Sequence, residues 1–273
     1  MSVTTLVMND GRRIPQIGLG LYLVDDDVTP GLVEGAIALG YRHLDTAALY
    51  GNERGTGEGI RRSGVSREEL FVTTKVWHHD HGYDLTLKAF DASLTRLGLE
   101  YVDLYLIHWP TPKRGKYADT WRAFEKLQSD GLVRSIGVSN FKPEHLERLR
   151  ATSSVVPAVN QVELHPWATQ PETRAYDAAH GILTESWSPF ARGGVLDNPV
   201  LERIAERHSK SPAQVVLRWH VQLGLVVIPK SVSLERVQKN AEIYDYRLDE
   251  SDMAAIAEME TGENTGPHAE ESM

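Results

Sequence analysis

The sequence predicts an α/β protein with the (β/α)8 barrel fold, preceded by a short N-terminal β-hairpin. Short apolar runs alternate with segments of helical periodicity eight times along the 273 residues, and strands that alternate with helices pair in parallel. Eight such units are typical of a closed barrel, and barrels of this length commonly form one domain. The first strand-to-helix turn contains Gly18-Leu19-Gly20 but does not continue as GxGxxG, which disfavours an open dinucleotide-binding sheet. We therefore interpret residues 1–273 as a single barrel domain.

The predicted strands follow from the apolar runs and from the turn signals between them. Residues 1–15 contain two short alternating pieces around Asn9-Asp10-Gly11, and Asp-Gly between such pieces is a strong hairpin signal. The eight barrel strands are expected at Ile17–Leu19, Tyr41–Asp45, Leu70–Lys75, Val102–His108, Ile136–Ser139, Ala158–Glu163, Ile182–Ser186 and Val226–Lys230.

The ends of the helices are indicated by the residues that flank the periodic segments. Pro30 and Pro212 suit a first helical turn, and Ser211 suits the N-cap before Pro212. Ser66 and Glu69 have the spacing of a capping box ahead of a strand. A glycine follows four of the helical segments, where a left-handed residue is often needed: Gly40, Gly98, Gly131 and Gly181.

Composition and charge narrow the classes of function. The net charge of −9 disfavours a nucleic-acid backbone as partner. The chain has no cysteine, which excludes disulfides, thiolate nucleophiles and cysteine-based metal sites. The N-terminal residues lack the basic start and apolar run of a signal peptide, and no apolar stretch has the length of a membrane-spanning helix. We expect a cytoplasmic protein without a membrane partner, whose polar tail at residues 261–273 is loosely ordered.

Four chemically active side chains lie at or just after the ends of three consecutive predicted strands. Asp45 ends the second strand and Tyr50 follows in its loop, while Lys75 and His108 end the third and fourth strands. Each one alone would have an ordinary explanation as a cap, a solvated charge or a packing residue. Catalytic side chains of barrels occupy the carboxyl ends of the strands and the loops that follow. The four together therefore predict a catalytic site.

The chemistry that these four residues can share is proton delivery by a phenol. Tyrosine has an ordinary pKa of about 10, which is high for an acid near neutrality, and an adjacent ammonium group lowers it. Lys75 can supply that charge, and Asp45 can keep Lys75 protonated when both are buried. His108 can donate a hydrogen bond to a substrate oxygen. Hydride has to come from a cofactor, since no side chain donates it.

With these residues in place, the sequence resembles the aldo-keto reductase family over nearly its whole length. The segments that carry the resemblance are GLGLY (18–22), GYRHLDTAALYGNE (40–53), TTKVW (73–77), VDLYLIHWP (102–110), IGVSNF (136–141), NQVELHP (160–166) and IPKSVSLERVQKN (228–240). In appearance the chain is most similar to the bacterial 2,5-diketo-D-gluconate reductases. The resemblance implies reduction of aldehyde or ketone carbonyls by a monomeric enzyme, with Tyr50 as general acid.

The resemblance also implies a cofactor, NADPH, and the residues that hold it. Ser139, Asn140 and Gln161 match the residues that bind the nicotinamide carboxamide, and Trp187 matches the aromatic residue that stacks on the ring. Further cofactor residues by family position are Gly20, Leu21, Asp45, Ser188 and Phe190 at the barrel mouth, and Lys230, Ser231, Val232, Arg236 and Asn240 around the 2′-phosphate and adenine. The chain departs from the family at Lys239, where glutamate is usual.

The substrate is left open by the sequence. The implied pocket residues are Tyr22, Tyr50, Trp77, His78, His108, Trp109 and Phe190, which indicate an opening with aromatic walls. The loops at 111–120 and 191–199 and the C-terminal tail are short, and in this family they shape specificity. Broad tolerance of carbonyl compounds is therefore expected, from small aldehydes to keto sugars that resemble 2,5-diketogluconate.

Three other functions would each use part of this pattern. A metal-dependent barrel hydrolase would use His43 and Asp45, but further ligand histidines at later strand ends are missing, and we predict no metal site. A Schiff-base aldolase would use Lys75 but would leave Tyr50 and Trp187 unexplained. An NADPH-binding regulatory subunit would not need the intact catalytic set.

Overall fold

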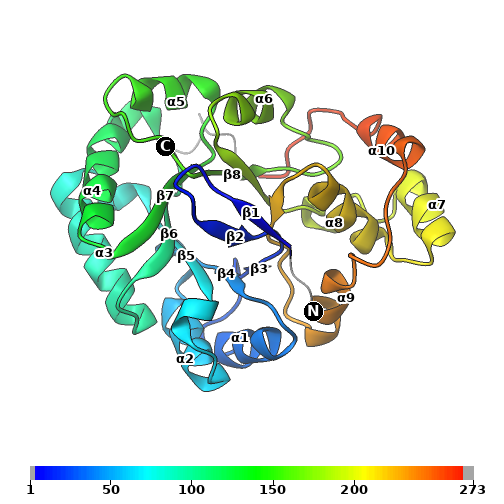
Figure 1. Ribbon diagram of the computed structural model, residues 1–273, viewed down its shortest axis with the longest axis horizontal. Coiled ribbons are helices and arrows are strands. Elements are labelled where there is room, and N and C mark those ends of the chain that lie inside the picture. Colours follow the sequence, from blue (N-terminus) through cyan, green and yellow to red (C-terminus); the bar gives the residue numbers. More distant parts are fainter. Residues whose placement is uncertain (1–3, 267–273) are drawn as a thin grey trace.

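A parallel sheet of eight strands curls into a barrel in the computed structural model, which describes residues 4–266 (Figure 1). The strands lie side by side in chain order: β3 (Leu19–Gly20), β4 (His43–Asp45), β5 (Phe71–Val76), β6 (Val102–Ile107), β7 (Val133–Ser139), β8 (Val159–Glu163), β9 (Leu183–Trp187) and β10 (Val226–Val227). Parallel bridges from Ile17 to Val227 and from Gly20 to Lys230 join the first strand to the last. The predicted (β/α)8 fold is confirmed.

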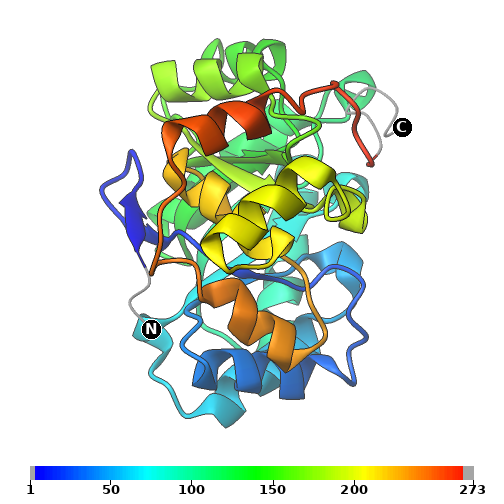
Figure 2. The same ribbon diagram turned by 90° about the vertical axis from the view of Figure 1, so that its right-hand side faces the viewer.

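The hairpin predicted at the N-terminus is also present. Strands β1 (Thr5–Val7) and β2 (Arg13–Pro15) pair antiparallel around a turn at Asn9-Asp10-Gly11. Met8 and Ile14 are buried with Leu104 and Val226, so the hairpin closes the amino-terminal end of the barrel. Figure 2 shows the hairpin at the left and the end of the described chain at the right, on opposite ends of the molecule.

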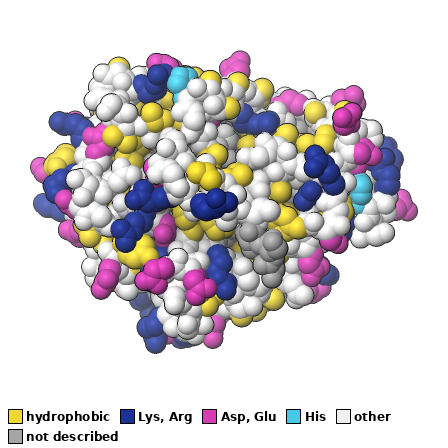
Figure 3. Space-filling view, in the orientation of Figure 1, with side chains coloured by type: hydrophobic (Ala, Val, Ile, Leu, Met, Phe, Trp, Pro, Cys, Tyr) yellow, Lys and Arg dark blue, Asp and Glu magenta, His cyan; other side chains and the backbone are white. Residues whose placement is uncertain are grey.

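Helices surround the sheet. They are α1 (Thr29–Ala38), α2 (Glu53–Ser63), α3 (Tyr83–Leu97), α4 (Tyr117–Ser129), α5 (Pro143–Arg150), α6 (Pro171–Ala179), α7 (Pro199–His208), α8 (Pro212–Gln222), α9 (Leu234–Ala241) and α10 (Glu250–Ala257). Within residues 4–266, none of these helices has the length and apolar character needed to cross a membrane. In the space-filling view of the hairpin end, basic and acidic side chains are interspersed, so this face carries no field of one sign (Figure 3).

The alternation of side chains along the strands determines which residues can reach a site. Successive residues of a strand point to opposite faces. On β5, Val76 lies against the helices in a cluster with Phe90 and Trp121, so its neighbour Lys75 points into the barrel. The same alternation directs Asp45 and Gln161 inward, and the hydrogen bond between their side chains across the barrel interior shows this direction.

Most of the predicted helix boundaries are confirmed. Ser211 caps α8 by accepting a hydrogen bond from the Gln214 backbone, and Pro30 and Pro212 lie in first helical turns. The four glycines predicted after helices all have positive φ.

The capping box predicted at Ser66 is wrong. A three-residue 3₁₀ turn, Arg67–Glu69, follows Ser66, whose side chain caps nothing. The Glu69 backbone N–H already donates to the Ser66 carbonyl, which leaves no free donor for the hydroxyl. The first barrel strand is also shifted from the predicted Ile17–Leu19, because Ile17 and Gly18 contact Val227 on the last strand.

The first part of the tail is ordered by the barrel mouth, contrary to the expectation for residues 261–273. Glu163, at the end of β8, accepts hydrogen bonds from the backbone of Thr265 at 2.8 Å and of Gly266 at 3.0 Å. Thr261 and Gly262 donate to the Trp167 carbonyl. A buried carboxylate needs donors, and the tail supplies them. Residues 267–273 of this prediction lie outside the described residues.

A buried carboxyl group outside the barrel interior leads to a prediction about stability. Asp177 on α6 is fully buried, accepts hydrogen bonds from Thr184 at 2.9 Å and Asn160 at 3.3 Å, and has no cation within salt-bridge distance among the described residues. Burial raises the pKa of Asp177 to about 7, although both hydrogen bonds oppose the shift. The folded protein therefore binds this proton more tightly than the unfolded chain, whose aspartates have a pKa of about 4.

We expect the contribution of protonated Asp177 to the free energy of unfolding to be fully present below pH 4 and to be lost as pH rises to about 7. The slope reaches about 1.4 kcal/mol per pH unit where the two states differ by a full proton. Asp177→Asn should remove this slope in urea unfolding measured from pH 4 to 8. The exposed Asp197→Asn is the control and should keep the wild-type slope. An unchanged slope in Asp177→Asn would contradict the prediction.

Candidate active site

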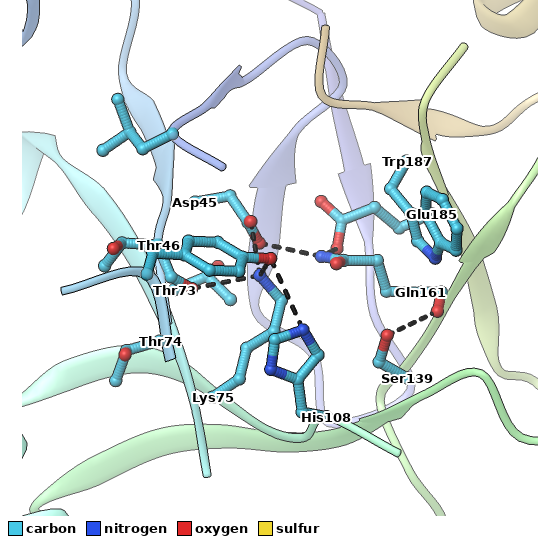
Figure 4. Close-up of polar contacts among 12 residues, drawn as sticks. Asp45, Thr46, Thr73, Thr74, Lys75, His108, Ser139, Gln161, Glu185 and Trp187 are labelled. Carbon is cyan, nitrogen blue, oxygen red and sulfur yellow. Dashed lines mark hydrogen bonds and ion pairs between the residues drawn. The ribbon is translucent and has the colours of Figure 1, made fainter. Parts of the chain in front are cut away.

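The four side chains predicted at the strand ends meet at one end of the barrel. The Lys75 ammonium lies 2.5 Å from Asp45 Oδ1, 3.0 Å from the Thr46 carbonyl oxygen and 3.3 Å from the Tyr50 hydroxyl. The Tyr50 hydroxyl lies 3.5 Å from His108 Nε2. Figure 4 shows Asp45, Lys75 and His108 converging from three different strands or strand ends. Tyr50 reaches them from a 3₁₀ turn, Ala48–Tyr50, directly after β4.

Lys75 is held in its charged form. Its side chain is 0% exposed, and that of Asp45 is 2% exposed. Burial by itself lowers the pKa of Lys75, but the Asp45 carboxylate and the Tyr50 oxygen outweigh it, and the net shift is upward. The site therefore has a fixed positive charge beside the tyrosine hydroxyl.

Tyr50 is a neutral phenol at physiological pH. Burial raises the pKa of Tyr50 to about 12, and the Lys75 ammonium offsets only part of that shift. The expectation that Lys75 brings the Tyr50 pKa down is therefore right for the effect of Lys75 itself and wrong for the net shift. Desolvation of the phenolate is the larger effect in the site without a ligand.

His108 is a neutral imidazole with its single hydrogen available to the site. Burial, followed by the positive Lys75 nearby, lowers the pKa of His108 well below its ordinary value. Its Nδ1 is buried and has no hydrogen-bond partner in the described part of the chain, whereas Nε2 faces the Tyr50 hydroxyl. We therefore assign the hydrogen to Nε2, where it can be donated.

A second group of predicted residues forms one hydrogen-bonded wall beside this cluster. Ser139 Oγ donates to the Gln161 carbonyl at 2.8 Å, and Asn140 Nδ2 donates to Ser139 Oγ at 3.1 Å. The indole of Trp187 donates to Asn140 Oδ1 at 2.9 Å, which fixes the plane of its ring. Asn140 and Ser188 have φ values of +63° and +50°. Positive φ is uncommon for residues other than glycine, although asparagine adopts it more readily, and it is concentrated at functional sites.

The residues predicted around the 2′-phosphate follow the last strand. Lys230 and Val232 are exposed, Ser231 and Asn240 are buried, and Arg236 is exposed on the first turn of α9. Within residues 4–266, neither Lys230 nor Arg236 has a carboxylate within salt-bridge distance. Lys239 forms an ion pair with Glu235 at 2.7 Å, so the added charge expected at this position is partly compensated.

Two predicted cofactor residues at the start of the barrel have a structural task. A Cβ atom on Gly20 would lie 2.8 Å from the Ile228 carbonyl oxygen, so only glycine lets β3 approach the last strand. Leu21 is fully buried in the core, and both its backbone polar groups are bonded, to Asp45 and to Asn52. The place of Leu21 among the cofactor residues stays a prediction.

The aromatic residues predicted for substrate surround the catalytic cluster on two sides. The ring of Tyr22 lies 5.1 Å from that of Tyr50, and the ring of Trp77 lies 5.0 Å from that of His108. His78 is buried against Trp77, and Phe190 is half-buried. Trp109 lines a cavity of about 90 Å³ with Asn140, Trp187 and Asn264.

A cavity larger than this one lies away from the site. It has a volume of about 320 Å³ and lies beside the hairpin, lined by residues that include Asn9, Asp10 and Ala158. Ala158 precedes β8, so this cavity is at the amino-terminal end of the barrel, whereas the catalytic cluster is at the carboxyl end. Among residues 4–266 no three His, Asp or Glu side chains are arranged to hold a metal ion.

One buried residue of the site was missed from the sequence. Glu185 lies on β9 two residues before Trp187 and accepts a hydrogen bond from Gln161 at 2.8 Å. The signal was present, because strand alternation places positions 185 and 187 on the same face and a carboxyl group on an inward face needs a reason.

Comparison with known proteins agrees with this geometry. Residues 17–261 match the Aldo/keto reductase family. The chain is 51% identical over 268 residues to a glyoxal reductase of Bacillus subtilis, covering 98% of this chain and 96% of the relative. It is 44% identical over 266 residues to the methylglyoxal reductase DkgA of Escherichia coli, covering 97% and 96%. The crystal structure of a Gox0644 mutant in complex with NADPH superposes with a TM-score of 0.92, at 47% identity and covering 95% and 94% of the two chains. The chain belongs to the aldo/keto reductase family.

Proposed function

We propose that this protein reduces aldehyde and ketone carbonyls to alcohols with NADPH. The observation that carries the proposal is the position of the Lys75 ammonium, which contacts the Asp45 carboxylate and the Tyr50 hydroxyl at once. That arrangement suits a proton donor whose conjugate base is stabilised beside it. Membership of the family and the NADPH complex of a related structure support the choice of reaction and cofactor.

The residues at the barrel mouth fit a nicotinamide cofactor. Trp187 offers a flat aromatic face whose orientation is set by Asn140, and Arg236 and Lys230 offer exposed positive charges to a phosphate. Arginine binds phosphate in a bidentate manner and lysine acts as a point charge. We assign the carboxamide to Ser139, Asn140 and Gln161, and the rest of the cofactor to the residues around Ser231 and Asn240. When bound, NADPH supplies the hydride.

The protein's own part in the reaction is to orient the carbonyl and to move one proton. His108 Nε2–H donates a hydrogen bond to the carbonyl oxygen and places it beside Tyr50. The Tyr50 hydroxyl donates its proton to that oxygen as negative charge develops on it. Lys75 stabilises the resulting phenolate, and Asp45 keeps Lys75 charged throughout. These roles follow from the distances. The Tyr50 hydroxyl lies between the Lys75 ammonium and His108 Nε2, so it can receive stabilisation from the first and reach an oxygen held by the second.

The substrates that we propose are small aldehydes and dicarbonyl compounds. Relatives named as glyoxal and methylglyoxal reductases support this class, and the partly exposed Tyr22 and Trp77 leave the site open on one side. Keto sugars that resemble 2,5-diketogluconate remain a prediction from the sequence, as do a cytoplasmic location and a monomeric state.

The proposal is tested by mixing the purified protein with NADPH and methylglyoxal and following absorbance at 340 nm. We expect loss of absorbance that depends on both protein and aldehyde. A panel of aldehydes, keto acids and keto sugars at fixed NADPH then ranks the substrates. If NADPH binds but no carbonyl compound of the panel is consumed, the proposal is wrong and a regulatory NADPH-binding protein takes its place.

Arg236→Ala is expected to raise the Kd for NADPH about tenfold or more and to leave the Kd for NADH nearly unchanged. NADPH differs from NADH by the 2′-phosphate, and a charge-assisted hydrogen bond contributes roughly 1.5–3 kcal/mol. Quenching of tryptophan fluorescence measures both constants, because Trp187 is expected to lie against the nicotinamide. Raised salt should weaken NADPH more than NADH.

Lys239→Ala, one turn further along α9, is the matched control for Arg236. The Lys239 ammonium is already paired with Glu235, so its removal should raise the Kd for NADPH much less than the removal of Arg236 does. Equal losses of NADPH affinity in the two variants would mean that the total positive charge of α9 attracts the cofactor, and not a contact made by Arg236. Equal losses of affinity for NADPH and NADH in Arg236→Ala would mean that Arg236 holds the loop.

A further inference from the structure

The side chain of Gln161 is held between two buried carboxyl groups. Its Nε2 donates to Asp45 Oδ2 at 2.8 Å and to Glu185 Oε2 at 2.8 Å. Figure 4 shows Gln161 lying between Asp45 and Glu185. A primary amide has two hydrogens, and these two contacts use both. Only the amide oxygen of Gln161 is then left for a ligand.

The two carboxyl groups are not equivalent. Asp45 has the Lys75 ammonium at 2.5 Å in addition to Gln161. Glu185 has no cation within salt-bridge distance among the described residues. Its Oε1 is buried without a hydrogen-bond partner among residues 4–266, and His43 Nε2 lies 3.6 Å from it, with both side chains 0% exposed. Burial favours the neutral form of a carboxyl group that has no cation beside it, whereas an adjacent cation favours the ionised form. We therefore assign the proton to Glu185 and the negative charge to Asp45.

Among the described residues, the polar groups that interact with Glu185 come from three neighbouring strands. They are His43 and Asp45 of β4, Lys75 of β5 and the neutral Gln161 of β8. The one cation among them, Lys75, forms its ion pair with Asp45 and only weakly offsets the burial of Glu185. The titratable neighbours on the outer face of β9 belong to other contacts, since Asp177 bonds Thr184 and His220 bonds Ser186.

His43 supports this assignment of charge. Burial lowers the pKa of His43 to about 3, because its effect is larger than that of the backbone contact that would raise the pKa. The ring is therefore neutral. His43 Nε2 contacts Thr73 Oγ1 at 3.3 Å and lies 3.6 Å from Glu185, so a protonated Glu185 meets a neutral ring without a mismatch of charge. An ionised Glu185 would face a neutral ring and a second carboxylate.

We propose that Glu185 is a positioning residue of the reductase site, which as a neutral acid holds Gln161 with its amide oxygen toward the nicotinamide and leaves Asp45 as the single anion beside Lys75. The inference rests on the proposed function and goes beyond it by naming a residue that touches neither substrate nor cofactor. Burial, followed by repulsion from Asp45, raises the pKa of Glu185 to about 8. Above that pH a second negative charge enters the barrel interior.

That second charge has a predictable effect on Tyr50. A negative charge behind Asp45 destabilises the phenolate that forms as Tyr50 gives up its proton, so the tyrosine becomes a weaker acid. Orientation of Gln161 does not change, because a carboxylate accepts its hydrogen as well as the acid does. Ionisation of Glu185 should therefore lower kcat and leave the Kd for NADPH unaltered.

The first test is the pH profile of methylglyoxal reduction by Glu185→Gln. A glutamine accepts from Gln161, as the neutral acid does, but it cannot ionise. For a group with a pKa of about 8, wild-type kcat should fall about tenfold between pH 6.5 and 9. In Glu185→Gln the fall over the same range should be less than about threefold. Asp177→Asn, which removes a buried carboxyl group outside the site, should keep the wild-type profile.

The second test is NADPH affinity in Glu185→Leu, titrated by tryptophan fluorescence at pH 7. Leucine removes the acceptor and frees Gln161 to turn, so the Kd should rise about tenfold, whereas Glu185→Gln should stay within about threefold of wild type. The same alkaline fall in Glu185→Gln as in wild type overturns the proposal, and so does a wild-type Kd in Glu185→Leu. If Glu185→Leu does not fold, the pH profile of Glu185→Gln decides alone.

Failure of the proposed function looks different from failure of this inference. If the wild-type protein reduces no carbonyl compound of the panel, the proposed function is wrong, and the NADPH titration still tests whether Glu185 holds Gln161. Activity with an unaltered pH profile in Glu185→Gln defeats the inference alone.

Discussion

Tyr50→Phe is expected to lower kcat for carbonyl reduction by roughly 10²–10⁴-fold, the usual contribution of general acid catalysis. The phenylalanine ring keeps the packing against Tyr22 and His108, whose rings lie 5.1 and 5.5 Å away. Only the hydroxyl that contacts Lys75 and His108 is removed. NADPH binding should be unaffected, since the lost group is a proton donor and not a cofactor contact.

Stopped-flow measurement of a single turnover at saturating NADPH measures this loss without interference from product release. Tyr22→Phe is the matched control, because its hydroxyl belongs to the partly exposed wall and has no contact with Lys75 in the structure. Tyr22→Phe should lower the rate of carbonyl reduction far less than Tyr50→Phe does. Retention of more than about a tenth of wild-type kcat by Tyr50→Phe would show that another group supplies the proton.

Lys75→Met is expected to reduce activity to a similar extent and to remove the tyrosine limb from the pH–rate profile. The variant loses the ammonium that lies 3.3 Å from the Tyr50 hydroxyl, and with it the attraction that opposes the burial-driven rise in the pKa of Tyr50. Removal of one partner of a buried ion pair also destabilises a protein by about 3–5 kcal/mol, because the other charge remains buried. A lower Tm is therefore expected together with the loss of activity.

The double variant Asp45→Asn/Lys75→Met separates the two effects. It has no unpaired charge, so it should recover much of the lost stability in thermal unfolding while remaining inactive. If it regains activity along with stability, Lys75 acts only by holding the fold. A single variant whose pH profile matches wild type, with a small loss of rate, would equally argue against the tuning role.

The barrel and the catalytic cluster were within reach of sequence reasoning for a specific physical reason. Parallel strands present their carboxyl ends at one edge, so residues that end consecutive strands must lie near one another. Asp45, Lys75 and His108 were therefore placed correctly without knowledge of any distance. Local chemistry was equally readable at Ser211, whose hydroxyl caps α8, because N-capping depends on residues within one turn.

Long-range burial was not readable in this way. The tail at Thr265 and Gly266 looked loosely ordered because its own sequence is polar, yet its backbone donors are bonded to Glu163, more than a hundred residues earlier in the chain. This outcome depends on which surfaces meet after folding.

The sequence by itself determined the fold class, the order of the strands, and the meeting of a tyrosine with its lysine and aspartate, because these follow from periodicity and from the ends of neighbouring strands. Only the tertiary structure decided how each group titrates. Whether Lys75 lowers the net pKa of Tyr50, and which of Asp45 and Glu185 keeps a proton, depends on the removal of water from the barrel interior and on distances of 2.5–3.6 Å between residues far apart in the chain. Desolvation is a property of the assembled interior, so no local pattern of residues can report it.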